Sequence, residues 1–147
     1  LFADPVSTAK AVKLKGVLGR LHTLKPNRME AELLSGVPIT DEESLNRAAD
    51  ALLATGLRRV FISLGSDGVF AADHSARLHL PVLPAHMRNT TGCGDAFMAA
   101  IAWAYLQGTD LRGTALAGLA ASAIAMEGAG TINPTLGVQT LKARAGL

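Results

Sequence analysis

With 147 residues, of which 49% are hydrophobic and 18% charged, the chain has the size and composition of one globular domain. A formal net charge of only +2 and an aromatic content of 4%, without any run of Lys and Arg, exclude a nucleic-acid-binding surface. The single cysteine excludes an internal disulfide framework and a cysteine-based zinc site, which fits a reducing cytoplasm, so we expect a cytoplasmic protein. No apolar run is long enough to span a membrane.

The first half of the chain predicts strands alternating with helices. An apolar start followed by Asp4 and Pro5 resembles the end of a buried strand, so we expect the chain to begin inside a larger fold. Thr40 and Glu43 have the spacing of a helix capping box. The pattern predicts, in order, a helix over 7–21 capped by Ser7, a strand over 22–25, a helix over 27–34 ended by Gly36, and a helix over 40–55.

The second half continues the alternation and then becomes helical. We expect strands over 59–64, 69–72 and 78–83, and helices over 92–106, from Thr109 or Asp110 to Met126, and over 136–145. The strongest strands are almost entirely apolar, which is typical of a parallel sheet with helices on both faces. We therefore predict an α/β fold and a single domain over residues 1–147.

The segment Asn89–Phe97 carries the clearest chemical signal. Glycines flank Cys93 where a helix rich in small residues is expected to begin. The free amides and the dipole of a first helical turn suit a phosphoryl group, and Asp95 in that turn could accept a proton. An ordinary glycine-rich helix start fits the same spacing, because a short glycine motif is weak evidence by itself.

Four stretches, in the same order along the chain, resemble the PfkB/ribokinase family of small-molecule kinases. Asn89–Phe97 is similar to the family's second signature, Asp-Thr-x-Gly-x-Gly-Asp. Three further stretches support it: Asn27–Glu30 (Asn-x-x-Glu), Ser63–Gly68 (Thr/Ser-Leu-Gly-x-x-Gly), and the alanine-rich residues 115–125 followed by Gly128-Ala129-Gly130. The resemblance covers essentially the whole chain and implies the C-terminal portion of a ribokinase-like fold, without the N-terminal half and its β lid.

The resemblance also implies an activity and a set of site residues. It implies Mg²⁺-dependent transfer of the γ-phosphate of ATP to a hydroxyl of a small nucleoside or sugar. Asp95 would be the catalytic base, and the amides of Gly92, Cys93 and Gly94 would form an anion hole. The implied nucleotide-binding residues are Asn27, Ser63, Gly65, Ser66, Gly68 and Gly94, with residues 115–125 and 128–130 as the wall of the adenine pocket.

Asn27 and Glu30 would lie near Mg²⁺, largely through bound water, as the resemblance implies. Their spacing places both on one helix face, and Mg²⁺ keeps several waters alongside few protein carboxylates. Taken alone, the pair is better explained as an N-cap and its capping-box partner. Similarly, Ser63, Gly65 and Gly68 alone fit a strand that ends in a glycine turn.

Within the family, Asp4–Ser7, His22–Glu32 and Leu34–Gly36 look most like the branch that phosphorylates pseudouridine, which makes pseudouridine the first-choice acceptor. Asn89 stands where many members have an aspartate that helps to hold a monovalent cation, so the resemblance leaves K⁺ activation in doubt.

Because the N-terminal half of the family is missing, a truncated, non-catalytic nucleotide-binding or scaffold domain is the alternative. Association into a homo-oligomer is left open. A dinucleotide-binding domain fits less well, because Gly-x-Gly-x-x-Gly does not follow the first strand.

Overall fold

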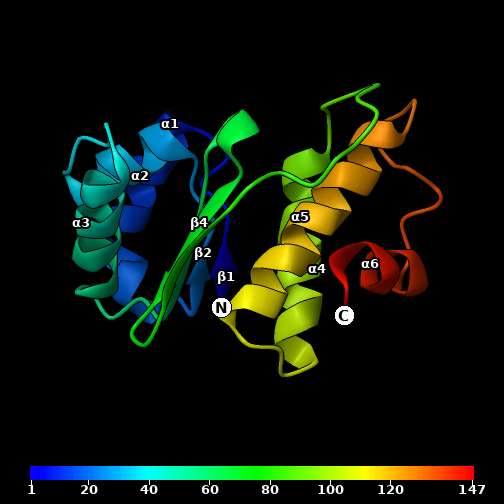
Figure 1. Cartoon of the computed structure of the whole chain (residues 1–147). Helices are drawn as coiled ribbons and strands as arrows, with labels where there is room; N and C mark the ends of the chain where they lie inside the picture. The colour runs from blue at the N-terminus through cyan, green and yellow to red at the C-terminus, as the bar shows by residue number, and fades with distance from the viewer. The chain divides into compact units, whose positions relative to one another are not determined.

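The computed structural model describes all residues from Leu1 to Leu147. The chain forms two compact units. Unit 1 comprises residues 1–65 and 69–79, and unit 2 comprises residues 66–68 and 80–147. In Figure 1 the ribbon of unit 1 runs from blue to green, and that of unit 2 runs mainly from green to red. The assignment of residues 1–147 to a single domain stays a prediction.

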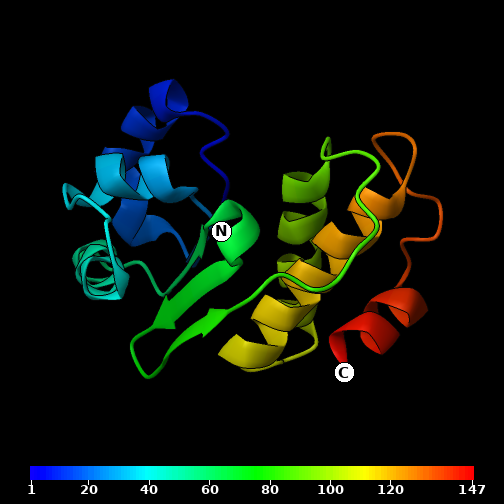
Figure 2. The ribbon, with the colours of Figure 1, turned by 45° about the horizontal axis from the view of Figure 1, so that its top comes forward.

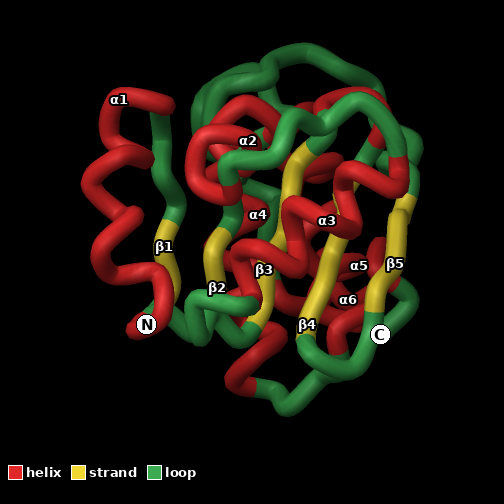
Figure 3. The backbone as a smooth tube through the Cα atoms, turned by 90° about the vertical axis from the view of Figure 1, so that its left-hand side faces the viewer, coloured by secondary structure: helices red, strands yellow, loops and turns green.

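A five-stranded mixed sheet in the order β1-β2-β3-β4-β5 is the framework of unit 1. Its strands are β1 (Phe2–Ala3), β2 (Thr23–Leu24), β3 (Arg59–Ser63), β4 (Val69–Asp73) and β5 (Arg77–Leu80). The first three are parallel, and β4 is antiparallel to β3. Figure 3 shows the strands side by side in this order. The predicted α/β class is therefore confirmed, with parallel pairing from β1 to β3.

The helical segments of the first 67 residues are α1 (Thr8–Ala11), the 3₁₀ segment η1 (Val12–Arg20), α2 (Arg28–Ser35), α3 (Glu42–Leu53) and the 3₁₀ turn η2 (Gly65–Asp67). Ser7 caps α1 as predicted. The single helix expected over 7–21 is wrong, because only four residues are α-helical before the 3₁₀ segment begins. Gly16 and Gly19 lie in this stretch, and two glycines weaken an α-helix.

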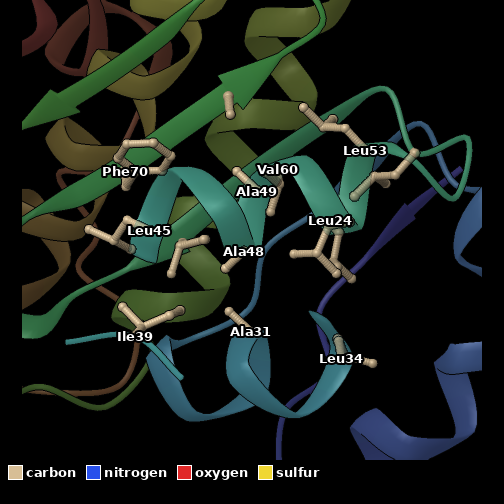
Figure 4. Packing of buried hydrophobic residues seen from close by; sticks show 14 of the residues in the cluster. Leu24, Ala31, Leu34, Ile39, Leu45, Ala48, Ala49, Leu53, Val60 and Phe70 are labelled. Atoms are coloured by element: carbon tan, nitrogen blue, oxygen red, sulfur yellow. The ribbon is translucent and has the colours of Figure 1, made fainter. Parts of the chain in front are cut away.

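The core of unit 1 consists of the apolar faces of α2 and α3 and the residues of the sheet (Figure 4). Leu24, Val60 and Phe70 from the strands and Ala31, Ala48 and Leu52 from the helices are almost completely buried. Small alanines on the helices let the backbones approach the β-branched and aromatic side chains of the strands. This packing holds α2 and α3 against the sheet.

Unit 2 is dominated by α4 (Cys93–Leu106), α5 (Leu111–Glu127) and α6 (Val138–Ala145). Figure 2 shows α6, in red, beside α5. The three helices bury a cluster of small and medium residues, namely Ala100, Ala104, Ala117, Ala120, Ala121, Leu141 and Ala145. Phe97 lies over Gly118, where a Cβ atom would come within 2.6 Å of its ring. Small residues therefore allow α4 and α5 to pack at short range. None of the helices is long and apolar enough to cross a bilayer.

The N-cap of α3 differs by one residue from the sequence prediction. Asp41, not Thr40, accepts the amide of Ser44 (2.8 Å), and the Ser44 hydroxyl accepts the amide of Asp41 (2.9 Å) in return. Serine can complete the reciprocal pair that the sequence analysis assigned to Thr40 and Glu43, because its hydroxyl both donates and accepts. Hydrogen bonds from Ser44 lower the pKa of Asp41 below its ordinary value.

This cap assignment can be tested by thermal unfolding. We expect Asp41→Ala to lower Tm by about 2–4 °C, because the first turn of α3 loses its acceptor, and Thr40→Ala to change Tm much less. The difference between wild type and Asp41→Ala is expected at neutral pH. It should disappear as the pH falls through the lowered pKa of the carboxyl group, because the protonated side chain is a weaker acceptor. Equal losses in the two variants would contradict the assignment.

Candidate active site

The turn that begins α4 depends on a glycine. Gly92 is the N-cap of α4 and has a left-handed backbone with φ of +86°. A Cβ atom there would lie 2.5 Å from the carbonyl oxygen of Thr131, so no other residue fits without displacement of the backbone. No side chain caps this helix. The amide of Cys93 makes a long hydrogen bond to Thr90 (3.4 Å), whereas those of Gly92 and Gly94 have no acceptor in the structure.

Asp95 lies in the first turn of α4, next to these amides in sequence. Its side chain is exposed, and its carboxylate makes no hydrogen bond or ion pair in the structure. This first turn is the positive end of the helix dipole, where negative charge is favourable. Unit 2 therefore combines a free carboxylate with unpaired amides in one helical turn, as the sequence predicts. This combination can accept a proton and stabilise an anion.

Cys93, between the two glycines, is half-buried, and its Sγ atom lies 3.9 Å from the carbonyl oxygen of Asn89. Burial raises the pKa of the Cys93 thiol above its ordinary value. A thiol that stays protonated at neutral pH is a poor nucleophile, although a helix N-terminus can lower such a pKa. The structure therefore favours a packing role for this side chain.

Asn89 shapes the loop before the glycines. Its Oδ1 atom accepts the amide of Thr91 (2.9 Å), and the amides of Arg88 and Asn89 donate to the carbonyl oxygen of Met126 (2.8 and 3.2 Å). The side-chain oxygen at this position thus already has a partner inside the loop. A neutral amide in place of a carboxylate also makes the site less attractive to a cation.

In unit 1, Asn27 and Glu30 form the reciprocal capping box of α2. The amide of Asn27 donates to Oε2 of Glu30, and the amide of Glu30 donates to Oδ1 of Asn27, both at 2.9 Å. Only 2% of Glu30 is exposed, yet its second carboxylate oxygen accepts no hydrogen bond in the structure. The capping interpretation is therefore confirmed, and one carboxylate oxygen of Glu30 remains available for a ligand.

Ser63 is brought beside this pair by the parallel sheet. Its amide donates to the carbonyl oxygen of Pro26 (2.9 Å), and a β-bridge joins Ser63 to Asn27. Carboxyl ends of parallel strands meet at one sheet edge, which is where ligands bind in open α/β folds. Asn27, Glu30 and Ser63 therefore share one edge of unit 1.

Sequence reasoning missed an ion pair at the same edge. Nζ of Lys25 lies 2.9 Å from Oδ2 of Asp4, and only 9% of the lysine side chain is exposed. Both residues directly follow strands, which is the signal that could have identified them. Val6, two residues after Asp4, has a φ of +66°, which is unusual for a β-branched residue.

The remaining predicted nucleotide residues lie in the turn after β3. Gly65 (φ +61°) and Ser66 belong to η2, and Gly68 follows it with φ of +90°. A Cβ atom on Gly68 would lie 1.9 Å from the carbonyl oxygen of Leu80, so this turn requires glycine. Ser63 and Gly65 belong to unit 1, and Ser66 and Gly68 belong to unit 2.

The expected adenine wall consists largely of core residues. All alanines of residues 115–125 are buried within α5, and Gly128 follows directly after that helix. No group of three or more His, Cys, Asp or Glu residues lies close enough together in the structure to hold a metal ion without other ligands. A metal ion at the sheet edge would therefore have few protein ligands, which is the arrangement that Mg²⁺ tolerates.

Comparison with known proteins identifies the family. The family model described as pfkB family carbohydrate kinase matches residues 2–136. The pseudouridine kinase of Escherichia coli K12 is 36% identical over 139 residues, which are 94% of this chain and 44% of that protein. A candidate sugar kinase from Clostridium perfringens superposes with a TM-score of 0.93 at 34% identity, over 99% of this chain and 46% of the other. The ribokinase of Thermotoga maritima superposes with a TM-score of 0.83 at 27% identity, over 99% and 48%.

These matches agree with the α/β architecture of the mixed sheet and its helices. The chain spans less than half the length of these relatives. With a family model matched over residues 2–136, the chain belongs to the pfkB family of carbohydrate kinases.

Proposed function

We propose that this chain supplies the phosphoryl-handling part of an ATP-dependent kinase that phosphorylates a hydroxyl of a sugar or nucleoside. The observation that carries the proposal is the turn at Gly92: it leaves amides unpaired and places the free carboxylate of Asp95 in the same helical turn. Phosphoryl transfer needs this combination, because the protein mainly positions the reactants and stabilises negative charge.

In the proposed reaction, Asp95 accepts the proton of the acceptor hydroxyl as that oxygen attacks the γ-phosphorus of ATP. The bond from this phosphorus to the β–γ bridging oxygen breaks, and ADP leaves. The amides of Gly92, Cys93 and Gly94 then donate hydrogen bonds to the phosphoryl oxygens. Such donors stabilise the transition state effectively because they are already oriented before the reaction starts. ATP is proposed to contact Ser63, Gly65, Ser66 and Gly68, with Asn27 near its phosphates.

The donor set at the edge of unit 1 fits Mg²⁺. Glu30 has a free carboxylate oxygen in a buried position, and Asn27 contributes an amide oxygen beside it. Hard oxygen ligands of this kind, completed by water, suit Mg²⁺. When bound, Mg²⁺ would neutralise charge on the ATP phosphates. Because Asn89 carries a neutral amide where many family members have an aspartate, we include no K⁺ requirement.

Pseudouridine is the first acceptor that we propose. The 36% identity to a pseudouridine kinase supports it, whereas other similar proteins carry the names ribokinase and deoxyribokinase. We propose a cytoplasmic enzyme with a small-molecule substrate and without a nucleic-acid or membrane partner. ADP formation with pseudouridine, ribose and deoxyribose would test the acceptor. Binding of ATP without phosphorylation of any acceptor would favour the alternative, a nucleotide-binding or scaffold domain.

The role of Asp95 can be separated from fold and binding. We expect Asp95→Asn to lower kcat by roughly 10²–10⁴-fold, because the amide cannot accept the hydroxyl proton, while ATP affinity stays within a few-fold. Asp110→Asn is a matched control, since Asp110 caps α5 and asparagine is an equally good cap. Steady-state ADP formation and calorimetric ATP binding provide the two readouts. Near-wild-type turnover by Asp95→Asn would contradict the role as base.

Capping and metal binding by Glu30 can also be separated. Glu30→Gln keeps an oxygen that accepts the Asn27 amide, so we expect nearly unchanged Tm, but a several-fold higher Mg²⁺ concentration for half-maximal activity. Glu32→Gln is the control. Glu32 lies on the same helix as Glu30, and its carboxylate also accepts a backbone amide, that of Ile39 (2.7 Å). If both variants show the same Mg²⁺ dependence as the wild type, Glu30 serves only as a cap.

A further inference from the structure

The last turns of α5 bind the residues just before the Gly92 turn and also a segment that follows α5, all within unit 2. The carbonyl oxygens at a helix C-terminus lack partners inside the helix and must find them elsewhere. Here, Met126 accepts the amides of Arg88 and Asn89 before the turn. The carbonyl oxygen of Ile124 accepts a hydrogen bond of 2.6 Å from Nδ2 of Asn133, which lies in the segment after α5.

Asn133 is buried, and its hydrogen bonds determine which end of its side-chain amide is the oxygen and which is the nitrogen. Only 8% of the residue is exposed. Its Oδ1 atom accepts the amide (3.0 Å) and the hydroxyl (2.9 Å) of Thr135, so its nitrogen must face the Ile124 carbonyl. A buried amide that satisfies both ends in this way fixes the backbone around it.

The segment that Asn133 fixes contacts the Gly92 turn. The carbonyl oxygen of Thr131, two residues before Asn133, occupies the space where a side chain of residue 92 would lie. Ser122 adds a second tie, because its hydroxyl donates to the carbonyl oxygen of Cys93 at 3.0 Å. Ser122 thus ties the turn to α5 directly, and Asn133 ties to α5 the segment whose Thr131 contacts the turn.

We propose that Asn133 and Ser122 are positioning residues for the Gly92–Asp95 turn. Asn133 acts through Thr131, and Ser122 acts through Cys93. Together they keep the unpaired amides and Asp95 in fixed orientations before a phosphate arrives. The orienting effect on the turn follows from these contacts alone, whereas its consequence for catalysis rests on the proposed kinase function.

The first test is amide hydrogen exchange at residues 88–96, which needs no activity. Asn133→Asp removes the donor to Ile124 and keeps the acceptor for Thr135, and Ser122→Ala removes only the donor to Cys93. We expect either variant to speed exchange at residues 88–96 by roughly 2–10-fold, the factor for one lost hydrogen bond, while the middle of α4 and α5 stays protected. Thr109→Val removes a hydroxyl that donates to the carbonyl oxygen of Ala104 (3.0 Å) at the opposite end of α4, and should leave exchange at residues 88–96 unchanged.

Turnover is the second readout. In an active wild type, we expect Asn133→Asp and Ser122→Ala to lower kcat by ~10-fold, since small displacements of catalytic groups are costly, and to leave KM for ATP almost unchanged. Unchanged exchange at residues 88–96 in folded Ser122→Ala would overturn the proposal even if Asn133→Asp does not fold. So would loss of protection throughout unit 2. An inactive wild type with the expected exchange pattern would instead refute the kinase function and leave the positioning role standing.

Discussion

The candidate active site depends on one steric constraint at residue 92. The carbonyl oxygen of Thr131 lies so near the Cα atom of Gly92 that a Cβ atom would be 2.5 Å from it. Only glycine permits both this approach and a φ of +86°. The consequence is a helix that begins without a side-chain cap, so that amides remain free for an anion and Asp95 remains free of partners.

A second constraint operates in unit 1, where parallel strands end at one sheet edge. The hydrogen bond from Ser63 to Pro26 places the end of β3 beside the start of α2. Burial of the α2 and α3 faces against the sheet holds that geometry, as the core in Figure 4 shows. Glu30 combines a structural role with a proposed functional one. One carboxylate oxygen accepts the Asn27 amide in the capping box, and the other has no hydrogen-bond partner and is proposed to face Mg²⁺.

Local signals in the sequence predicted much of this arrangement. Asn27, Gly36 and Gly92 lie where predicted, because caps and left-handed turns depend on few residues. The spacing of Thr40 and Glu43 predicts the α3 cap at Thr40, whereas in the structure Asp41 is the cap and Ser44 is its reciprocal partner. The positions of Asp4 and Lys25 directly after strands are a signal for that pair, although only the structure shows the contact. The contacts of Ser122 with Cys93 and of Asn133 with Ile124 could not be predicted, since they depend on how α5 packs in unit 2. The proposed catalytic roles likewise came from resemblance to a family, not from spacing alone.

The central claim is that the Gly92 turn binds the phosphates of ATP. Calorimetric titration of the wild type and Gly92→Ala with ATP, and of both with adenosine as a ligand without phosphates, tests it most directly. The account predicts that Gly92→Ala loses at least ~10-fold in ATP affinity while its affinity for adenosine stays the same, because the methyl group displaces the amides from their orientation. Equal ATP affinity in a folded Gly92→Ala variant would contradict the account.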